Sequence, residues 1–286
     1  MNSLDQSLSS LTERLAAVRG VVAVVLGGSR AEGSAGATSD TDIGLYYRED
    51  NSIRIDHLKE IAGELSLDTA CVVTELYEWG PWVNGGAWIR TAAGKVDLLY
   101  RNLDQVQRTI DDARSGVSSH DYRQQPAYGF YSVTYLAETS ICRALYDPEG
   151  VVSRLKRAVR DYPLRLKKRI VQNSLWSAEF SLAFADGVAR AGDVYSCMGS
   201  LARIAADLTQ ALYVLNEVYY LGDKRAMDRV AGFSHKSHDF VSQLTSALAG
   251  PAASSDDLER NVGTMTHLWQ GLVDIAGDRY RPRYPV

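Results

Sequence analysis

The sequence predicts an α+β protein, in which a half that mixes helices and strands precedes a mostly helical half. Two patterns indicate this class. Residues 1–105 alternate helical periodicities with short apolar runs, whereas the pattern from about residue 151 onward is helical almost throughout. A chain of 286 residues is long enough for two domains with cores of their own. We therefore expect domains over 1–105 and 151–286, with 106–150 as a connecting region.

The first half is expected to open with an amphipathic helix, because leucines recur at helical spacing from Leu4 to Leu15. The apolar run 21–26 is typical of a buried strand. A second strand is expected at 42–47 and a helix at about 53–65. Further strands are expected at 71–73, 88–91 and 96–100, the last two joined as a hairpin by a turn that contains glycine.

In the second half, an apolar stripe from Leu201 to Leu215 predicts a long amphipathic helix. Other helices are expected around 180–184, 241–248 and 265–275. The closing segment 279–285 is short, basic and rich in proline, which predicts a loosely held tail.

Composition restricts the class of function. Apolar residues make up 45% of the chain and charged residues 23%, as in ordinary globular proteins. The formal net charge of −4 argues against broad electrostatic binding of nucleic acid. No apolar run approaches the ~20 residues of a membrane span, and no secretory signal is expected at the amino terminus. Three scattered cysteines form neither a disulfide framework nor a zinc-ligand spacing. We expect a cytoplasmic protein with no membrane partner.

One stretch carries most of the chemical information. Gly28-Ser29 follows the 21–26 strand, and backbone N–H groups at such a turn can hold a phosphate chain. Asp40 and Asp42 lie two residues apart at the start of the next strand, so both carboxylates project to one side. Together these features predict a site for a metal–nucleotide complex.

Asp97 strengthens this prediction because it is an acidic residue within an otherwise apolar strand. A carboxylate in that position is costly unless it is paired or bound to metal. If its strand lies beside the Asp40–Asp42 strand, three carboxylates converge. Magnesium prefers oxygen ligands and keeps phosphate oxygens in its shell, and two ions at such a cluster can bridge a nucleotide and an attacking hydroxyl.

The ordered pattern of apolar strand, Gly28-Ser29, Asp40-Thr41-Asp42 and a later Asp97 resembles the DNA polymerase β-type nucleotidyltransferase superfamily, over about residues 20–100. The resemblance implies a small mixed sheet flanked by helices. It implies that Gly28 and Ser29 hold the β- and γ-phosphates and that Asp40 and Asp42 bind the metals. Asp97 would complete a metal site or serve as the base for the acceptor hydroxyl.

The helical half, 151–286, is similar in layout to that of aminoglycoside and lincosamide nucleotidyltransferases, where it helps to form the acceptor pocket. This second comparison depends on layout rather than on a motif. It implies that 151–286 is an acceptor or partner domain.

Two other phosphate-binding motifs do not fit the glycine turn. A Walker-type loop ends in Gly-Lys-Ser/Thr, and no lysine occurs between Gly20 and Asp50. A dinucleotide-binding turn reads Gly-x-Gly-x-x-Gly, of which residues 28–33 supply only a part.

The sequence leaves the roles of several polar residues of the first half open. Arg30 either contacts the phosphates or solvates the start of a helix. Lys95 lies in the expected hairpin turn and is interpreted as a solvated charge. Glu75 either approaches the metals or is a surface carboxylate, the latter favoured.

In the second half, Glu179, Asp193 and Asp207 either serve the acceptor or play structural parts, for Asp193 as a helix N-cap. The aromatic side chains either stack on a base or sugar or pack in the core; they are Trp176, Tyr195, Tyr213, Tyr219 and Tyr220. The segment from Tyr213 to Tyr220 could also supply an exposed face for a homodimer.

The leading hypothesis is an enzyme of the EC 2.7.7 type that depends on Mg²⁺. It would transfer a nucleoside monophosphate, AMP from ATP, to a hydroxyl of a small molecule such as an antibiotic or metabolite, and release pyrophosphate. One alternative is a nucleotidyltransferase with a protein or RNA acceptor, RNA being disfavoured by the charge balance. Another is a non-catalytic nucleotide-binding protein on the same scaffold.

Overall fold

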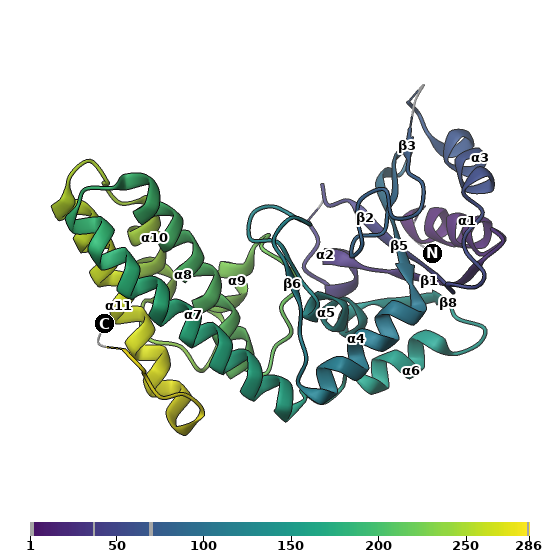
Figure 1. Cartoon of the computed structure of the whole chain (residues 1–286). Coiled ribbons are helices and arrows are strands. Elements are labelled where there is room, and N and C mark those ends of the chain that lie inside the picture. Colours follow the sequence, from purple (N-terminus) through teal and green to yellow (C-terminus); the bar gives the residue numbers. More distant parts are fainter. Residues whose placement is uncertain (1–2, 37, 69–70, 285) are drawn as a thin grey trace. The chain divides into compact units, whose positions relative to one another are not determined.

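The computed structural model describes the whole chain except residues 1–2, 37, 69–70 and 285. It divides into two compact units (Figure 1). Unit 1 comprises residues 1–112 and 120–161, and unit 2 comprises 113–119 and 162–286. The α+β class predicted from the sequence is confirmed, with a sheet in the first unit and helices in the second.

Unit 1 is built on a six-stranded sheet in the order β3-β4-β5-β2-β1-β8. Its strands are β1 (Val21–Leu26), β2 (Thr41–Tyr47), β3 (Val72–Val73), β4 (Gly86–Thr91), β5 (Gly94–Asn102) and β8 (Arg143–Tyr146). Strands β2 and β5 are parallel, and all other neighbours in this sheet are antiparallel. The small mixed sheet implied by the resemblance is therefore present.

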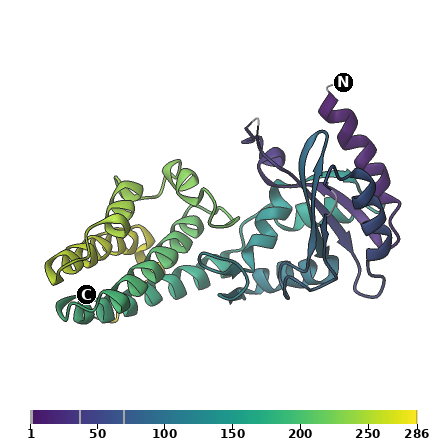
Figure 2. The ribbon, with the colours of Figure 1, turned by 90° about the horizontal axis from the view of Figure 1, so that it is seen from above.

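Helices α1 (Ser3–Ala16) and α3 (Ile55–Leu65) cover one face of this sheet, and Figure 2 shows both on the same side of it. The core between them is apolar because alternate strand residues point the same way. It joins Leu15 of α1 and Leu58 of α3 with strand residues such as Ile43 and Leu98. Each of these side chains is fully buried. Because side chains alternate along a strand, the remaining side chains of β2 and β5 point to the opposite face of the sheet.

The opposite face carries the remaining elements of unit 1. They are α2 (Gly28–Glu32), the start of α4 (Leu103–Ser115), the hairpin β6 (His120–Asp121) and β7 (Phe130–Tyr131), α5 (Val133–Ile141) and α6 (Val151–Ala158). The buried guanidinium of Arg101 on β5 donates two hydrogen bonds to Glu138 of α5, at 2.8 and 2.7 Å. Because a buried charge must be paired, this contact fixes α5 against the sheet.

Unit 2 is helical. It contains α7 (Leu164–Arg190), α8 (Val194–Leu215), α9 (Ala226–Ala231), α10 (Phe240–Ala249), α11 (Ser255–Ala276) and the 3-10 turn η1 (Gly277–Arg279). The long helices pack through apolar stripes, of which Leu201 to Leu215 on α8 was expected from the sequence. The indole N–H of Trp269 on α11 donates to the carbonyl of Leu175 on α7 at 3.0 Å. Among the described helices of both units, none has the length and apolar character of a membrane span.

The expectation of a loose carboxy-terminal tail is wrong. Glu179 on α7 is completely buried, and its carboxylate accepts hydrogen bonds from the Tyr280 hydroxyl and from the backbone N–H groups of Arg283 and Tyr284. A buried carboxylate requires donors of this kind. Glu179 thus has a structural part, as the anchor of the tail.

The apolar helix face expected to be open for a homodimer is covered within unit 2. Tyr213 and Tyr220 are both buried. The Tyr213 ring meets Tyr220 edge to face at 5.1 Å and Phe233 at 5.0 Å. These aromatic side chains belong to the core, which was one of the two interpretations. The structure of this segment therefore gives no reason to place a dimer contact there.

Candidate active site

The parallel pairing of β2 with β5 places Asp42 directly beside Asp97. The neighbouring pairs Thr41–Val96 and Ile43–Leu98 point into the core, so the two aspartates point to the opposite face. The side chain of Asp97 is 19% exposed. The expected approach of the two strands is thus present, with the carboxylates at the same level of the sheet.

The glycine-serine turn packs against Asp42. The backbone N–H of Gly27 donates to the carbonyl oxygen of Asp42 at 2.8 Å, which holds the end of β1 beside the start of β2. Helix α2 begins at Gly28, whose φ is +56°. A Cβ atom on this residue would overlap the carboxylate of Asp42. Glycine is required at position 28 for two reasons: the left-handed backbone and the close approach of the carboxylate.

Arg30 holds the segment that leads into Asp40. Its Nε donates to the carbonyl of Asp40 at 3.1 Å, and its Nη2 donates to the carbonyl of Ser39 at 2.5 Å. The guanidinium therefore positions the backbone of a predicted metal ligand. Neither of the two roles foreseen for Arg30, phosphate contact or solvation of the helix start, includes this contact.

Lys95 lies between two of the carboxylates. Its Nζ is 3.0 Å from Asp40 Oδ2, and 3.3 and 3.4 Å from the two carboxylate oxygens of Asp97. The hydrogen bond to Asp40 raises the pKa of the Lys95 ammonium above its ordinary value. The interpretation of Lys95 as a solvated charge is wrong. Its spacing of two residues from Asp97 on one strand was the available signal, because such residues share a face.

The donor set fits a hard divalent cation. Carboxylate oxygens are the ligands that Mg²⁺ prefers. Asp97 Oδ1 is buried and has no hydrogen-bond donor beyond the long contact to the Lys95 ammonium. In the part of the chain that the structure describes, no three acidic, His or Cys side chains are yet arranged to close on one ion. An ion held by three of these side chains would therefore require them to reorient.

Trp88 adds an aromatic surface that the sequence analysis did not single out. It pairs with Asp97 across β4 and β5 and therefore lies on the same face. Its side chain is 49% exposed, and its ring stacks on that of Trp79 with centroids 4.9 Å apart. An exposed indole beside a carboxylate offers a flat surface to a substrate ring.

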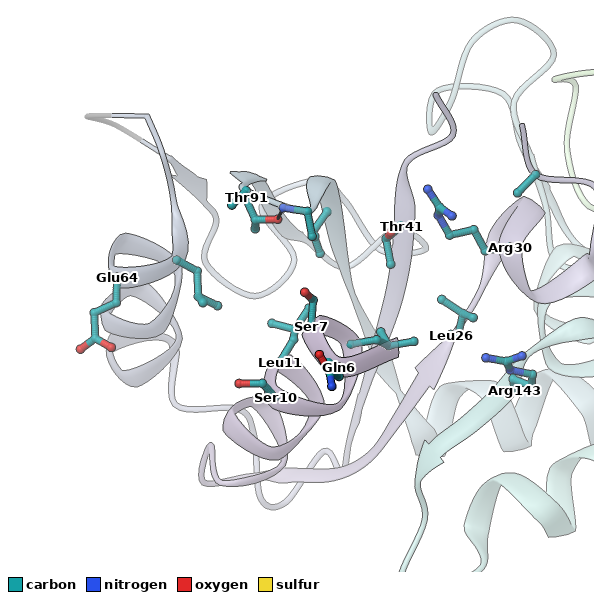
Figure 3. Close-up of a pocket in the computed structure, with 16 residues that line it drawn as sticks. Gln6, Ser7, Ser10, Leu11, Leu26, Arg30, Thr41, Glu64, Thr91 and Arg143 are labelled. Carbon is teal, nitrogen blue, oxygen red and sulfur yellow. Dashed lines mark hydrogen bonds between the residues drawn. The ribbon is translucent and has the colours of Figure 1, made fainter. Parts of the chain in front are cut away.

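A cavity of about 670 Å³ lies on the other side of the sheet (Figure 3). Leu11 of α1, Leu65 of α3 and Val96 of β5 give it apolar walls, and Arg30 and Arg143 lie toward one end. It does not adjoin the side chains of Asp42 and Asp97, which project from the opposite face. Arg30 lines this cavity and also contacts the backbone of Asp40.

Other acidic residues considered for the site have local partners. Glu75 is an exposed carboxylate paired with Lys59 at 2.7 Å. Asp193 caps α8 by accepting the backbone N–H of Ser196 at 3.1 Å, as the structural interpretation predicted. Asp207 on α8 lies near Ser177 and Arg203, and burial raises its pKa to about 7.

Comparison with known proteins finds family models that match two parts of the chain. Residues 7–78 match the family model described as nucleotidyltransferase domain, and residues 131–224 match a domain of unknown function (DUF4037). The chain is also similar to a solved nucleotidyltransferase-like protein from Exiguobacterium sibiricum 255-15, with 10% identity over 97% of this chain and 78% of the other, and a TM-score of 0.47. No curated protein matches the chain.

The mixed sheet, the glycine-serine turn and the paired carboxylates all lie in unit 1, which contains the segment that matches the nucleotidyltransferase model. The chain carries a DNA polymerase β-type nucleotidyltransferase domain. The matched segment includes Gly28, Ser29, Asp40 and Asp42. Asp97 lies beyond it and is joined to the site by the β2–β5 register.

Proposed function

We propose that this protein is a Mg²⁺-dependent nucleotidyltransferase that transfers AMP from ATP to a hydroxyl of a small molecule, such as an antibiotic or a metabolite, and releases pyrophosphate. The observation that carries the proposal is the position of Asp42 and Asp97. They lie in register on neighbouring strands, with the Gly28 turn packed on the first of them.

In this proposal Gly28 and Ser29 bind the β- and γ-phosphates, and Asp40 and Asp42 hold the metal. Bound magnesium would neutralise the charge that builds on the α-phosphate. The acceptor oxygen forms a bond to the α-phosphorus while the bond to the pyrophosphate oxygen breaks. The acceptor proton passes to Asp97, or to solvent water if Asp97 serves as a third metal ligand. Positioning and electrostatic stabilisation then supply most of the rate.

Two features favour a small acceptor. The net charge of −4 disfavours a polyanion such as RNA. Trp88, half-exposed beside Asp97, provides a stacking surface for a substrate ring. A small hydroxyl compound with a sugar-like or aromatic ring suits both features.

The direct test supplies the protein with each of the four α-labelled nucleoside triphosphates, Mg²⁺ and pools of candidate acceptors. The proposal expects ATP-dependent label on a small molecule together with pyrophosphate release. Label on protein or on RNA would show that the protein is a nucleotidyltransferase with a protein or RNA acceptor instead of a small molecule. Mg²⁺-dependent ATP binding with no pyrophosphate release from any acceptor pool would indicate a non-catalytic nucleotide-binding protein.

Asp42→Asn is the variant that tests the metal site. The amide keeps the shape of the side chain but removes the charge that holds a divalent cation, so transfer should fall at least about a hundredfold. Asp56→Asn is a matched control, because Asp56 is 82% exposed on α3. The free energy of unfolding of both variants should stay within about 0.5 kcal/mol of the original protein. Transfer by Asp42→Asn at the rate of the control would overturn the assignment.

A further inference from the structure

Lys95 has no part in the proposed reaction, yet its ammonium contacts two of the carboxylates of the site, Asp40 and Asp97. Strand register explains why it occurs. Thr41 pairs with Val96, so the preceding residues Asp40 and Lys95 lie side by side at the open ends of β2 and β5. Lys95 also precedes Asp97 by two residues and shares its face. One ammonium thereby reaches two carboxylates from two strands.

The ammonium of Lys95 places a positive charge beside two of the carboxylates, Asp40 and Asp97. Asp42 and Asp97 lie in register on neighbouring strands, and Asp40 shares the Lys95 ammonium with Asp97, so like charges lie near one another and repel. Arg90 lies opposite Lys95 on β4, but its guanidinium is bound to Asp68. Arg30 is bound to backbone carbonyls and not to these carboxylates. Lys95 is therefore the cation that contacts Asp40 and Asp97 among the described residues.

This contact is of a kind that exchanges readily. The side chain of Lys95 is 50% exposed, and its distances to Asp97 are long for hydrogen bonds. A lysine ammonium is a compact, hydrated charge on a flexible stem, whereas arginine would hold two carboxylates with a rigid fork. A divalent cation carries twice the charge and suits the same oxygens better.

We propose that Lys95 is the resident counter-ion of the carboxylate cluster, and that a divalent cation entering the site displaces its ammonium from Asp40 and Asp97. This inference rests on the proposed function, because it takes these carboxylates as the metal site. It assigns Lys95 as a positioning residue that offsets part of the negative charge of Asp40 and Asp97 until the metal arrives. A consequence is that the protein has a lower affinity for a free divalent cation than its carboxylates alone would give.

The test measures Mn²⁺ binding to the full chain without nucleotide, by electron paramagnetic resonance. Lys95→Ala should raise the Mn²⁺ affinity about three- to tenfold, which is the effect of losing two partly exposed ion pairs. Lys59→Ala is the matched control. Lys59 is 46% exposed and pairs with a single carboxylate, Glu75, on the same unit. It should change the affinity less than about twofold, since screened charges at a distance contribute little.

Lys95→Arg provides a second variant that keeps the charge. Because a guanidinium bridges two carboxylates at least as well as an ammonium, its Mn²⁺ affinity should not exceed that of the original protein. A rise as large as that of Lys95→Ala would overturn the inference, as would equal affinities for Lys95→Ala and Lys59→Ala. Unfolding curves of the three variants verify that each is folded.

Failure of this inference is distinguishable from failure of the proposed function. If Asp42→Asn loses transfer while Lys95→Ala leaves Mn²⁺ binding unchanged, only the role of Lys95 is wrong. If the original protein releases no pyrophosphate from ATP with any acceptor but Lys95→Ala binds Mn²⁺ more tightly, the counter-ion role stands and the enzymatic proposal fails.

Discussion

At the scale of single residues, the site depends on close approaches that leave no room for substitution. Gly28 combines a left-handed backbone with a neighbouring carboxylate that occupies the place of a Cβ atom. Lys95 and Arg30 add cationic contacts around Asp40, one to its side chain and one to its carbonyl. Arg30 thus holds the backbone at Asp40, and Lys95 contacts its carboxylate.

Gly28→Ala tests the close approach to Asp42. The new methyl group would displace the Asp42 carboxylate, and a displacement near 1 Å is enough to lower transfer roughly a hundredfold. Gly33→Ala is a matched control, because Gly33 also has a positive φ, +82°, but no atom lies within 4 Å of a Cβ there. Both variants should lose about 1 kcal/mol of stability from backbone strain. Rate measurements and denaturant unfolding separate the two effects; equal rates for both variants would contradict the steric argument.

At the scale of elements, strand periodicity and apolar runs were sufficient to predict β1, β2 and the β4–β5 hairpin. They were sufficient because each strand alternates between a buried face and an exposed one, or is buried throughout. The approach of Asp42 and Asp97 was also predictable once both strands were placed side by side. The contacts of Lys95 with the carboxylates were missed because the hairpin turn was expected to include it, whereas β5 already begins at Gly94.

The anchor of the tail was not predictable from local pattern. Glu179 and Tyr280 are 101 residues apart in sequence, and nothing near either residue indicates the other. The composition of the tail indicated a solvated segment, but three donors converge on one buried carboxylate. The need of a buried carboxylate for hydrogen-bond donors therefore determines the structure of the tail, although the local composition indicates a solvated segment.

The contact of α7 with α8 contains a carboxylate whose ionisation opposes folding. Burial raises the pKa of Asp207 to about 7, although a hydrogen bond with Ser177 and the charge of Arg203 partly offset this effect. The folded state therefore holds the proton between pH 4 and 7, while the unfolded chain releases it. Stability from this group is present at low pH and is lost as pH rises through 7.

Asp207→Asn removes this loss because the amide does not ionise. The variant should nearly match the original protein near pH 4 and exceed its free energy of unfolding by about 4 kcal/mol at pH 8, because the pKa differs by about three units between the folded and unfolded states. Denaturant unfolding of both proteins at the two pH values measures the difference, and the low pH serves as the internal control. A difference that does not grow with pH would show that Asp207 is ionised in the folded state.

At the scale of the whole molecule, every residue assigned to the donor side of the reaction lies in unit 1, between Gly28 and Asp97. Unit 2 has its own apolar core, with Leu208 completely buried on α8. Each unit therefore has the contacts of a cooperative folding unit.

Ligand binding should distinguish the two units. ATP with Mg²⁺ at about a hundred times its dissociation constant should stabilise unit 1 by about 2.7 kcal/mol, because a ligand stabilises the part of the chain that binds it. Calorimetry with unit-specific variants assigns the transitions: Leu58→Ala lowers that of unit 1 and Leu208→Ala that of unit 2, each by about 2–5 kcal/mol. We expect the nucleotide to raise the first transition in both variants and to leave the second in place. A shift confined to the transition that Leu208→Ala lowers would place the nucleotide in the helical unit and contradict the donor site at Gly28, Asp42 and Asp97.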